Sequence, residues 1–160
     1  MALPNLDFDM GELATASGDK SAALRWYSKA LLLQQKLMAR HPNDSSRETE
    51  LKKLFIASAK LACTTQNLND ARDWYRKALS LEGVLAERQC SDNCDFDLKN
   101  LYVSLAELAA TAEDSAEAIK LYHEALVIQR RIVARQPNDH YRRSDMEALE
   151  KRLASLSKTL

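Results

Sequence analysis

The pattern of apolar and polar positions predicts helices along almost the whole chain. Small and apolar residues recur three and four positions apart, as in Ala23, Tyr27 and Ala30, and this spacing places them on one face of a helix. Runs rich in Ala, Leu, Lys, Arg, Glu and Gln favour helix because these residues lose little rotamer freedom there. Short turn-forming stretches at residues 18–19 and 67–70 separate the runs. We therefore predict an all-α fold.

The helical pattern repeats three times. Residues 23–31 recur as residues 71–79 and again as residues 118–126. Corresponding positions are 48 and then 47 residues apart, so the period is nearly constant. A fixed period of this length is typical of repeat architectures, in which each unit is one pair of helices.

A second block marks the end of each repeat. Residues 39–44 (Ala-Arg-His-Pro-Asn-Asp) match residues 134–139 (Ala-Arg-Gln-Pro-Asn-Asp). The middle copy, residues 87–92, has Cys90 in the place of the proline. Because the residue before a proline avoids the helical region, the second helix of a repeat is expected to end here. Two aligned blocks with the same period indicate a true internal repeat.

These boundaries divide the chain into three units and a terminal helix. The units are expected at about residues 5–44, 45–92 and 93–139, and the terminal helix at residues 140–160. A solenoid needs such a terminal element to cover its last apolar face. The 160 residues suffice for a single domain, residues 1–160, with a substantial core.

The repeated unit resembles the tetratricopeptide repeat family. The family's first helix carries aromatic-x-x-Leu-small-x-x-small, which residues 55–62 and 102–109 approach, with the family's glycine present at Gly11 in the first unit. Its second helix carries Ala-x-x-x-aromatic-x-x-Ala, as in residues 23–30, and then a proline. The resemblance covers nearly the whole chain. It implies a right-handed α-solenoid of antiparallel helix hairpins.

The period departs from that of the family. Tetratricopeptide repeats are about 34 residues long, whereas these are 47 to 48. A surplus of whole turns in both helices keeps the packing face in register, at about 3.6 residues per turn. Long repeats of this kind resemble those of kinesin light chains and of bacterial regulatory and scaffold proteins. The first helix, from Asn5 to about Ser17, lacks the surplus turns. It is either a natural blunt start or the edge of a longer array, and we favour the second.

The charge of the chain gives no indication of a nucleic-acid partner. The chain has 23 basic and 23 acidic residues and a formal net charge of zero, so nothing points to nucleic acid or an anionic membrane as a partner. No apolar run approaches the ~18 residues of a membrane-spanning helix, and the N-terminus does not resemble a secretory signal. Three cysteines at no disulfide-framework spacing favour a reducing compartment. We expect a cytoplasmic protein, of bacterial origin by the resemblance.

No catalytic constellation is present in the sequence. A Gly-rich phosphate loop, a serine elbow and paired histidines are all missing, so we expect no enzyme activity, no metal and no cofactor. Cys90 and Cys94 could bind a metal or form a small disulfide, but two linker thiols is the preferred interpretation. Cys63 is expected to act as a small apolar residue. Trp26 and Trp74 are expected to pack between helices rather than to clamp a ligand.

The resemblance also implies where a partner binds. In this family the first helices line a concave groove that takes extended or helical peptides. The residues that the repeat register places on this face are Phe8, Glu12, Thr15, Lys53, Ile56, Lys60, Cys63, Asn100, Val103, Glu107, Ala110 and Lys151, continued by Ser155 and Lys158. Phe8, Ile56 and Val103 hold equivalent places and predict an apolar stripe, which usually marks an interaction site. The alternative is that the longer helices tilt these residues into the core.

Family members that grip acidic C-terminal tails of chaperones use Lys and Asn where this chain has Phe8 and Glu12, so that clamp is not expected. The leading hypothesis is a protein–protein interaction module, a scaffold that binds a partner segment in the groove. One alternative is a small chaperone or adaptor for a secreted or regulated client. Another is self-assembly into homo-oligomers through uncovered repeat ends.

Overall fold

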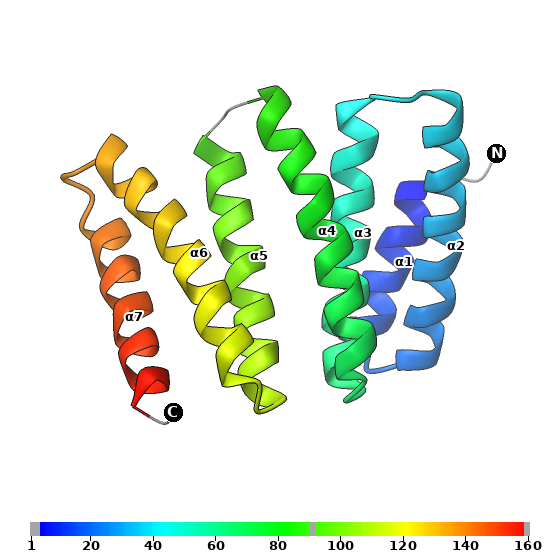
Figure 1. The fold of residues 1–160 in the computed structure, drawn as a ribbon. Helices are drawn as coiled ribbons and strands as arrows, with labels where there is room; N and C mark the ends of the chain where they lie inside the picture. The colour runs from blue at the N-terminus through cyan, green and yellow to red at the C-terminus, as the bar shows by residue number, and fades with distance from the viewer. Residues whose placement is uncertain (1–3, 90–91, 159–160) are drawn as a thin grey trace. The chain divides into compact units, whose positions relative to one another are not determined.

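The computed structural model describes residues 4–89 and 92–158, and these residues form seven helices and no strand (Figure 1). The helices are α1 (Pro4–Ala16), α2 (Lys20–Arg40), α3 (Ser45–Thr64), α4 (Leu68–Gln89), α5 (Asp92–Thr111), α6 (Ser115–Arg135) and α7 (His140–Ser157). The prediction of an all-α fold is confirmed. The helices from α2 to α6 have 20 to 22 residues and α1 has 13, so the first helix does lack the additional turns.

The chain divides into two compact units, Met1–Leu81 (unit 1) and Glu82–Leu160 (unit 2), with the division inside α4. In unit 1, α2 packs against both α1 and α3. In unit 2, α6 packs in the same way against α5 and α7. Unit 1 therefore holds α1, α2, α3 and the first part of α4, and unit 2 holds the end of α4 with α5, α6 and α7. The expectation of a single domain over residues 1–160 stays a prediction.

Aspartates begin the helices that follow the turns. Asp19 and Asp114 each accept one hydrogen bond from a backbone N–H three residues on, at the starts of α2 and α6. Asp44 and Asp139 each accept two, at the starts of α3 and α7. These bonds satisfy N–H groups that have no partner within the helix. They also lower the pKa of Asp19 and of Asp139.

The turn between the two helices of each repeat contains one residue in the left-handed region. It is Gly18 (φ 80°) in the first repeat, Gln66 (φ 59°) in the second and Glu113 (φ 59°) in the third. These positions are 48 and 47 residues apart, so they are equivalent by the period of the sequence. Only the first repeat has the glycine that this conformation favours.

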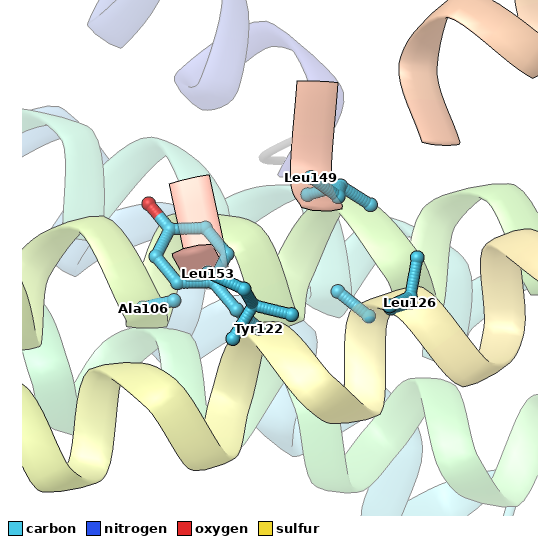
Figure 2. Close-up of a cluster of buried hydrophobic side chains, with 6 residues drawn as sticks. Ala106, Tyr122, Leu126, Leu149 and Leu153 are labelled. Atoms are coloured by element: carbon cyan, nitrogen blue, oxygen red, sulfur yellow. The ribbon is translucent and has the colours of Figure 1, made fainter. Parts of the chain in front are cut away.

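The core is built from the alanines and tyrosines of the repeated block. Tyr27, Tyr75 and Tyr122 are all at least 93% buried, and the alanines four before and three after each are fully buried. Figure 2 shows this arrangement in unit 2, where Tyr122 and Leu126 of α6 lie against Leu149 and Leu153 of α7. Small residues beside each ring allow the helices to approach closely.

Gly11 is the closest of these approaches. A Cβ added to Gly11 would lie 2.4 Å from Cε1 of Tyr27. The equivalent positions in the next repeats are Ala59 and Ala106, both fully buried. The α1 backbone therefore lies so near the Tyr27 ring that glycine is required there.

A buried glutamine connects consecutive repeats. Gln34 Nε2 donates to the carbonyl oxygen of Arg47 at 2.9 Å, and Gln129 Nε2 donates to that of Arg142 at 2.7 Å. Both glutamines are at most 2% exposed, and Glu82 holds the equivalent buried place in the middle repeat. These bonds join the last turns of a second helix to the first turns of the next helix. They therefore stabilise the part of the hairpin that the family's shorter repeats lack.

The outer face of α1 is not covered. Leu6 and Leu13 are 58% and 63% exposed, whereas their equivalents in α3, Leu54 and Leu61, are 3% and 2% exposed. The difference follows from packing, because α3 packs on α2, the helix before it, whereas no helix of the described residues precedes α1.

Candidate partner-binding site

A cavity of about 270 Å³ lies on one side of unit 1 between α1 and α3. The residues that line it are Phe8, Glu12, Thr15, Tyr27, Lys53, Ile56, Ala57 and Lys60. Phe8 and Ile56 are half-buried and form its apolar part, while the charged side chains are exposed at its rim. The six of these residues that the repeat register placed in the groove therefore come together around one cavity.

The hydroxyl of Tyr27 reaches this cavity from α2. The ring is 2% exposed and packs against Phe8, with centroids 6.0 Å apart. Its hydroxyl donates to Oε1 of Glu12 at 2.5 Å and lies 3.2 Å from the hydroxyl of Thr15. Burial, and then the bond to the Glu12 carboxylate, raises the pKa of Tyr27 to about 12. Tyr27 is therefore both a core residue and a polar group of the cavity.

The two lysines at this rim are differently engaged. Lys53 forms an ion pair with Glu50 on its own helix at 2.9 Å, whereas Lys60 lies one turn after Ile56 and is exposed. In the described part of the chain, no basic side chain lies within ion-pair distance of Glu12. The cavity thus presents a carboxylate bonded to a neutral phenol.

A second cavity, of about 180 Å³, lies between α5 and α7 of unit 2. Its lining residues are Lys99, Asn100, Val103, Glu107, Asp145, Ala148, Leu149 and Arg152. Lys99 is buried, its ammonium group lies over the ring of Phe96, and it forms an ion pair with Asp145 at 3.4 Å. Three residues of the predicted groove, Asn100, Val103 and Glu107, line this cavity.

The two cavities occupy equivalent places in the repeat and differ at one important position, where unit 1 has alanine and unit 2 has arginine. Glu107 and Tyr122 stand 95 residues after Glu12 and Tyr27. Arg152 stands 95 residues after Ala57. In unit 2 the Arg152 guanidinium donates to the Glu107 carboxylate and, at 3.1 Å, to the Tyr122 hydroxyl.

These two bonds, that to Tyr122 first, raise the pKa of Arg152. In unit 1 the methyl group of Ala57 leaves the equivalent space open, and the cavity is larger. The same glutamate and tyrosine therefore meet a cation from the chain itself in unit 2 and open space in unit 1.

Five residues of the predicted row do not line these cavities, and two of them, Ser155 and Lys158, are exposed near the end of α7. Cys63 and Ala110 lie one turn beyond Lys60 and Glu107, towards the helix ends, and Lys151 is exposed beside Arg152. Burial raises the pKa of the Cys63 thiol. Cys90 falls outside the described residues, so the suggested pair of Cys90 and Cys94 cannot be placed, and Cys94 is buried.

Tyr27, Ala57 and Arg152 are the site residues that the sequence argument missed. The sequence pattern placed Tyr27 on one helix face with Ala23 and Ala30 and gave it no role in binding. The repeat could have shown that Ala57 and Arg152 are equivalent, because Ala57 follows Asp44 by 13 positions and Arg152 follows Asp139 by the same number. Only the structure shows that both positions face a tyrosine hydroxyl.

The described residues contain no group of three or more His, Cys, Asp or Glu side chains that could hold a metal ion. Nor does any helix among them have the length and apolar character needed to cross a membrane.

Similarity to known proteins is found at the level of structure. No protein-family model matches the sequence, and no curated protein matches it. The structure is similar to BtubC (BKLC) from P. vanneervenii, with a TM-score of 0.59 and 18% identity over 94% of this chain. This chain spans 60% of the length of that protein.

Two further similarities have lower TM-scores. MamA protein has a TM-score of 0.41 at 15% identity, covering 97% of this chain and 90% of its own. A thermophilic TPR protein from Thermus thermophilus has a TM-score of 0.29 at 16% identity, covering 92% of this chain and 98% of its own. The similarity to BtubC, with the seven helices, confirms the predicted tetratricopeptide-like helical repeat fold.

Proposed function

We propose that this chain is a cytoplasmic protein-interaction scaffold in which each unit binds a partner-protein segment on its own first-helix face, lined by α1 and α3 in unit 1 and by α5 and α7 in unit 2. The observation that carries the proposal is the pair of equivalent cavities on these faces. Each combines half-buried apolar side chains, Phe8 and Ile56 or Val103, with charged residues at the rim. Such a combination suits a peptide, because apolar contacts supply affinity and the polar rim supplies orientation.

The test is selection from a phage-displayed library of random peptides on the immobilised chain. Peptides selected by the wild type should bind at least about tenfold more weakly to the double variant Ile56→Ala with Val103→Ala, since truncating a central interface residue commonly costs more than about 1 kcal/mol. Far-UV circular dichroism checks that the variant keeps its helicity.

A matched control is available on the second helices. Leu32 and Val127 are equivalent by the repeat, are 53% and 56% exposed, and lie outside both cavities. Their replacement by alanine should leave peptide binding unchanged. Selected peptides whose affinity depends equally on the control pair, or not at all on Ile56 and Val103, would place binding elsewhere.

Self-assembly is a second candidate, favoured by the uncovered face of α1. Leu6 and Leu13 are exposed at positions that are buried in α3, and contiguous exposed apolar surface favours association. Sedimentation velocity at two concentrations should show a larger species that disappears in the variant with Leu6→Gln and Leu13→Gln. A wild-type chain that stays monomeric at the higher concentration excludes this candidate.

A further inference from the structure

In unit 2 the glutamate and tyrosine of the cavity bind an arginine of the chain itself, Arg152. The equivalent cavity of unit 1 has Ala57 at that position and therefore has space for an arginine from outside. We propose that the cavity of unit 1 takes an arginine side chain from the partner segment, whose guanidinium binds Glu12 and the Tyr27 hydroxyl. This inference rests on the proposed function and adds the chemistry of the partner at one of its two cavities.

The argument starts from the internal equivalence. Arg152 shows what the glutamate–tyrosine pair binds when a guanidinium is within reach, because it donates to both Glu107 and Tyr122. Glu12 and Tyr27 stand at the equivalent places, and there the Tyr27 hydroxyl donates directly to the Glu12 carboxylate at 2.5 Å. A tyrosine hydroxyl can donate to a carboxylate and accept from a guanidinium at the same time. A guanidinium can therefore be added to the unit 1 pair without breaking the bond already there.

The space and the charge agree with this occupant. The cavity of about 270 Å³ lies where Ala57 replaces Arg152, and it opens beside Glu12. Arginine fits such a place better than lysine does, because its planar fork can donate to the carboxylate and the phenol together while its methylene stem covers Phe8 and Ile56. Bonds between charged groups of this kind are roughly twice as strong as neutral ones.

The remaining rim predicts a second feature of the segment. Lys60 lies on the same cavity and is exposed. A carboxylate next to the partner's arginine would lie near Lys60 and pair with it. The segment is therefore expected to combine an arginine with a neighbouring acidic residue.

The test uses the random-peptide library on the full-length chain. Peptides selected by the wild type should share an arginine, and binding of a synthetic selected peptide should fall at least about tenfold when that arginine is replaced by citrulline, which is neutral but of nearly the same shape. Glu12→Gln should cause a loss of similar size, and the two changes together should cost little more than either alone.

Asp9→Asn provides the control on the same helix. Asp9 lies three residues before Glu12, is exposed and does not line the cavity, so this change removes the same formal charge but should leave affinity within about twofold at physiological salt.

Peptides that depend on Ile56 and Val103 but carry no common arginine, or that bind Glu12→Gln as well as the wild type, would overturn this inference and leave the proposed function standing. A library from which no peptide is selected would overturn both.

Discussion

Replacing Glu113 by glycine should stabilise unit 2, although it deletes a side chain and adds backbone freedom. Glu113 has φ 59° and is exposed. An L-residue in the left-handed region costs roughly 1–2 kcal/mol. Glycine removes that cost but loses about 0.4–1 kcal/mol through the greater freedom of the unfolded chain. The net gain is therefore about 0–1.6 kcal/mol, with a midpoint of about 0.8 kcal/mol.

Gly18 provides the reverse experiment at the equivalent position of the first repeat. Its φ is 80° and nothing lies within 4 Å of an added Cβ. The change Gly18→Ala therefore adds backbone strain without a steric clash, and unit 1 should lose a comparable amount of stability. The matched control is Ala112→Gly, because Ala112 is exposed, lies next to Glu113 and is not in the left-handed region. That change should destabilise.

The two tryptophans allow the units to be followed separately. Trp26 and Trp74 are the only two tryptophans of the chain, and both lie in unit 1. Tryptophan fluorescence therefore reports the unfolding of unit 1, while far-UV circular dichroism reports all helices. With glycine at position 113 the melting temperature seen by circular dichroism should rise by about 2–4 °C for each kcal/mol gained if the chain unfolds as one. It should rise by about 4–8 °C for each kcal/mol if unit 2 unfolds alone. A lower midpoint for Glu113→Gly, or equal shifts for Glu113→Gly and Ala112→Gly, would refute the reasoning.

Two further changes test the packing around Tyr27. Gly11→Ala should lower the stability seen by fluorescence by about 1–3 kcal/mol, because its Cβ would overlap the Tyr27 ring. The control is Gly83→Ala in unit 2, a helical glycine with nothing within 4 Å of its added Cβ, which should gain up to about 1 kcal/mol when followed by circular dichroism. A neutral Gly11→Ala would mean that α1 can shift away. The pKa of Tyr27 is raised from 10.0 to about 12, so its neutral form contributes stability fully below pH 10 and loses it as the pH rises through about 12. The stability difference between the wild type and Tyr27→Phe should therefore shrink between these two pH values, and a difference independent of pH would contradict the raised pKa.

The periodic features could be read from the sequence because each depends on neighbours a few residues away. Helix faces and the helix ends before Pro42 and Pro137 follow from local spacing, and the structure places them as expected. Contacts between distant residues could not be read in this way. Asp7 is 4% exposed and pairs with Lys29 of α2 at 2.8 Å. Nothing local distinguishes Asp7 from an exposed aspartate.

The candidate site likewise has features that follow from local spacing and features that depend on contacts between distant residues. The row containing Phe8, Glu12 and Ile56 follows from the register of the first helices, and these three residues line one cavity. The depth of the cavity does not follow from it. That depth depends on whether the next first helix carries Ala57 or Arg152 opposite the tyrosine, and on which hydroxyls the buried rings direct outward.

The lengthened repeat separates the structural bonds from the proposed binding surface, and this separation can be measured. Gln34 bonds to Arg47 in the turns that the longer helices add, near the proline end of the hairpin, whereas Glu12 and Tyr27 meet near the end that carries Gly18. Because the two sets share no residue, their effects should be independent. Gln34→Leu removes a buried hydrogen bond and should lower the stability of unit 1 by about 0.5–1.5 kcal/mol, measured by tryptophan fluorescence, while affinity for a selected peptide stays unchanged. Glu12→Gln should lower the affinity for the peptide and leave the stability of unit 1 unchanged. Residue 12 is exposed, and the amide oxygen of the glutamine can still accept the hydrogen bond from Tyr27. A Gln34→Leu variant that also loses peptide affinity would show that the added turns position the cavity, and the division of the hairpin into a stabilising end and a binding end would then be wrong.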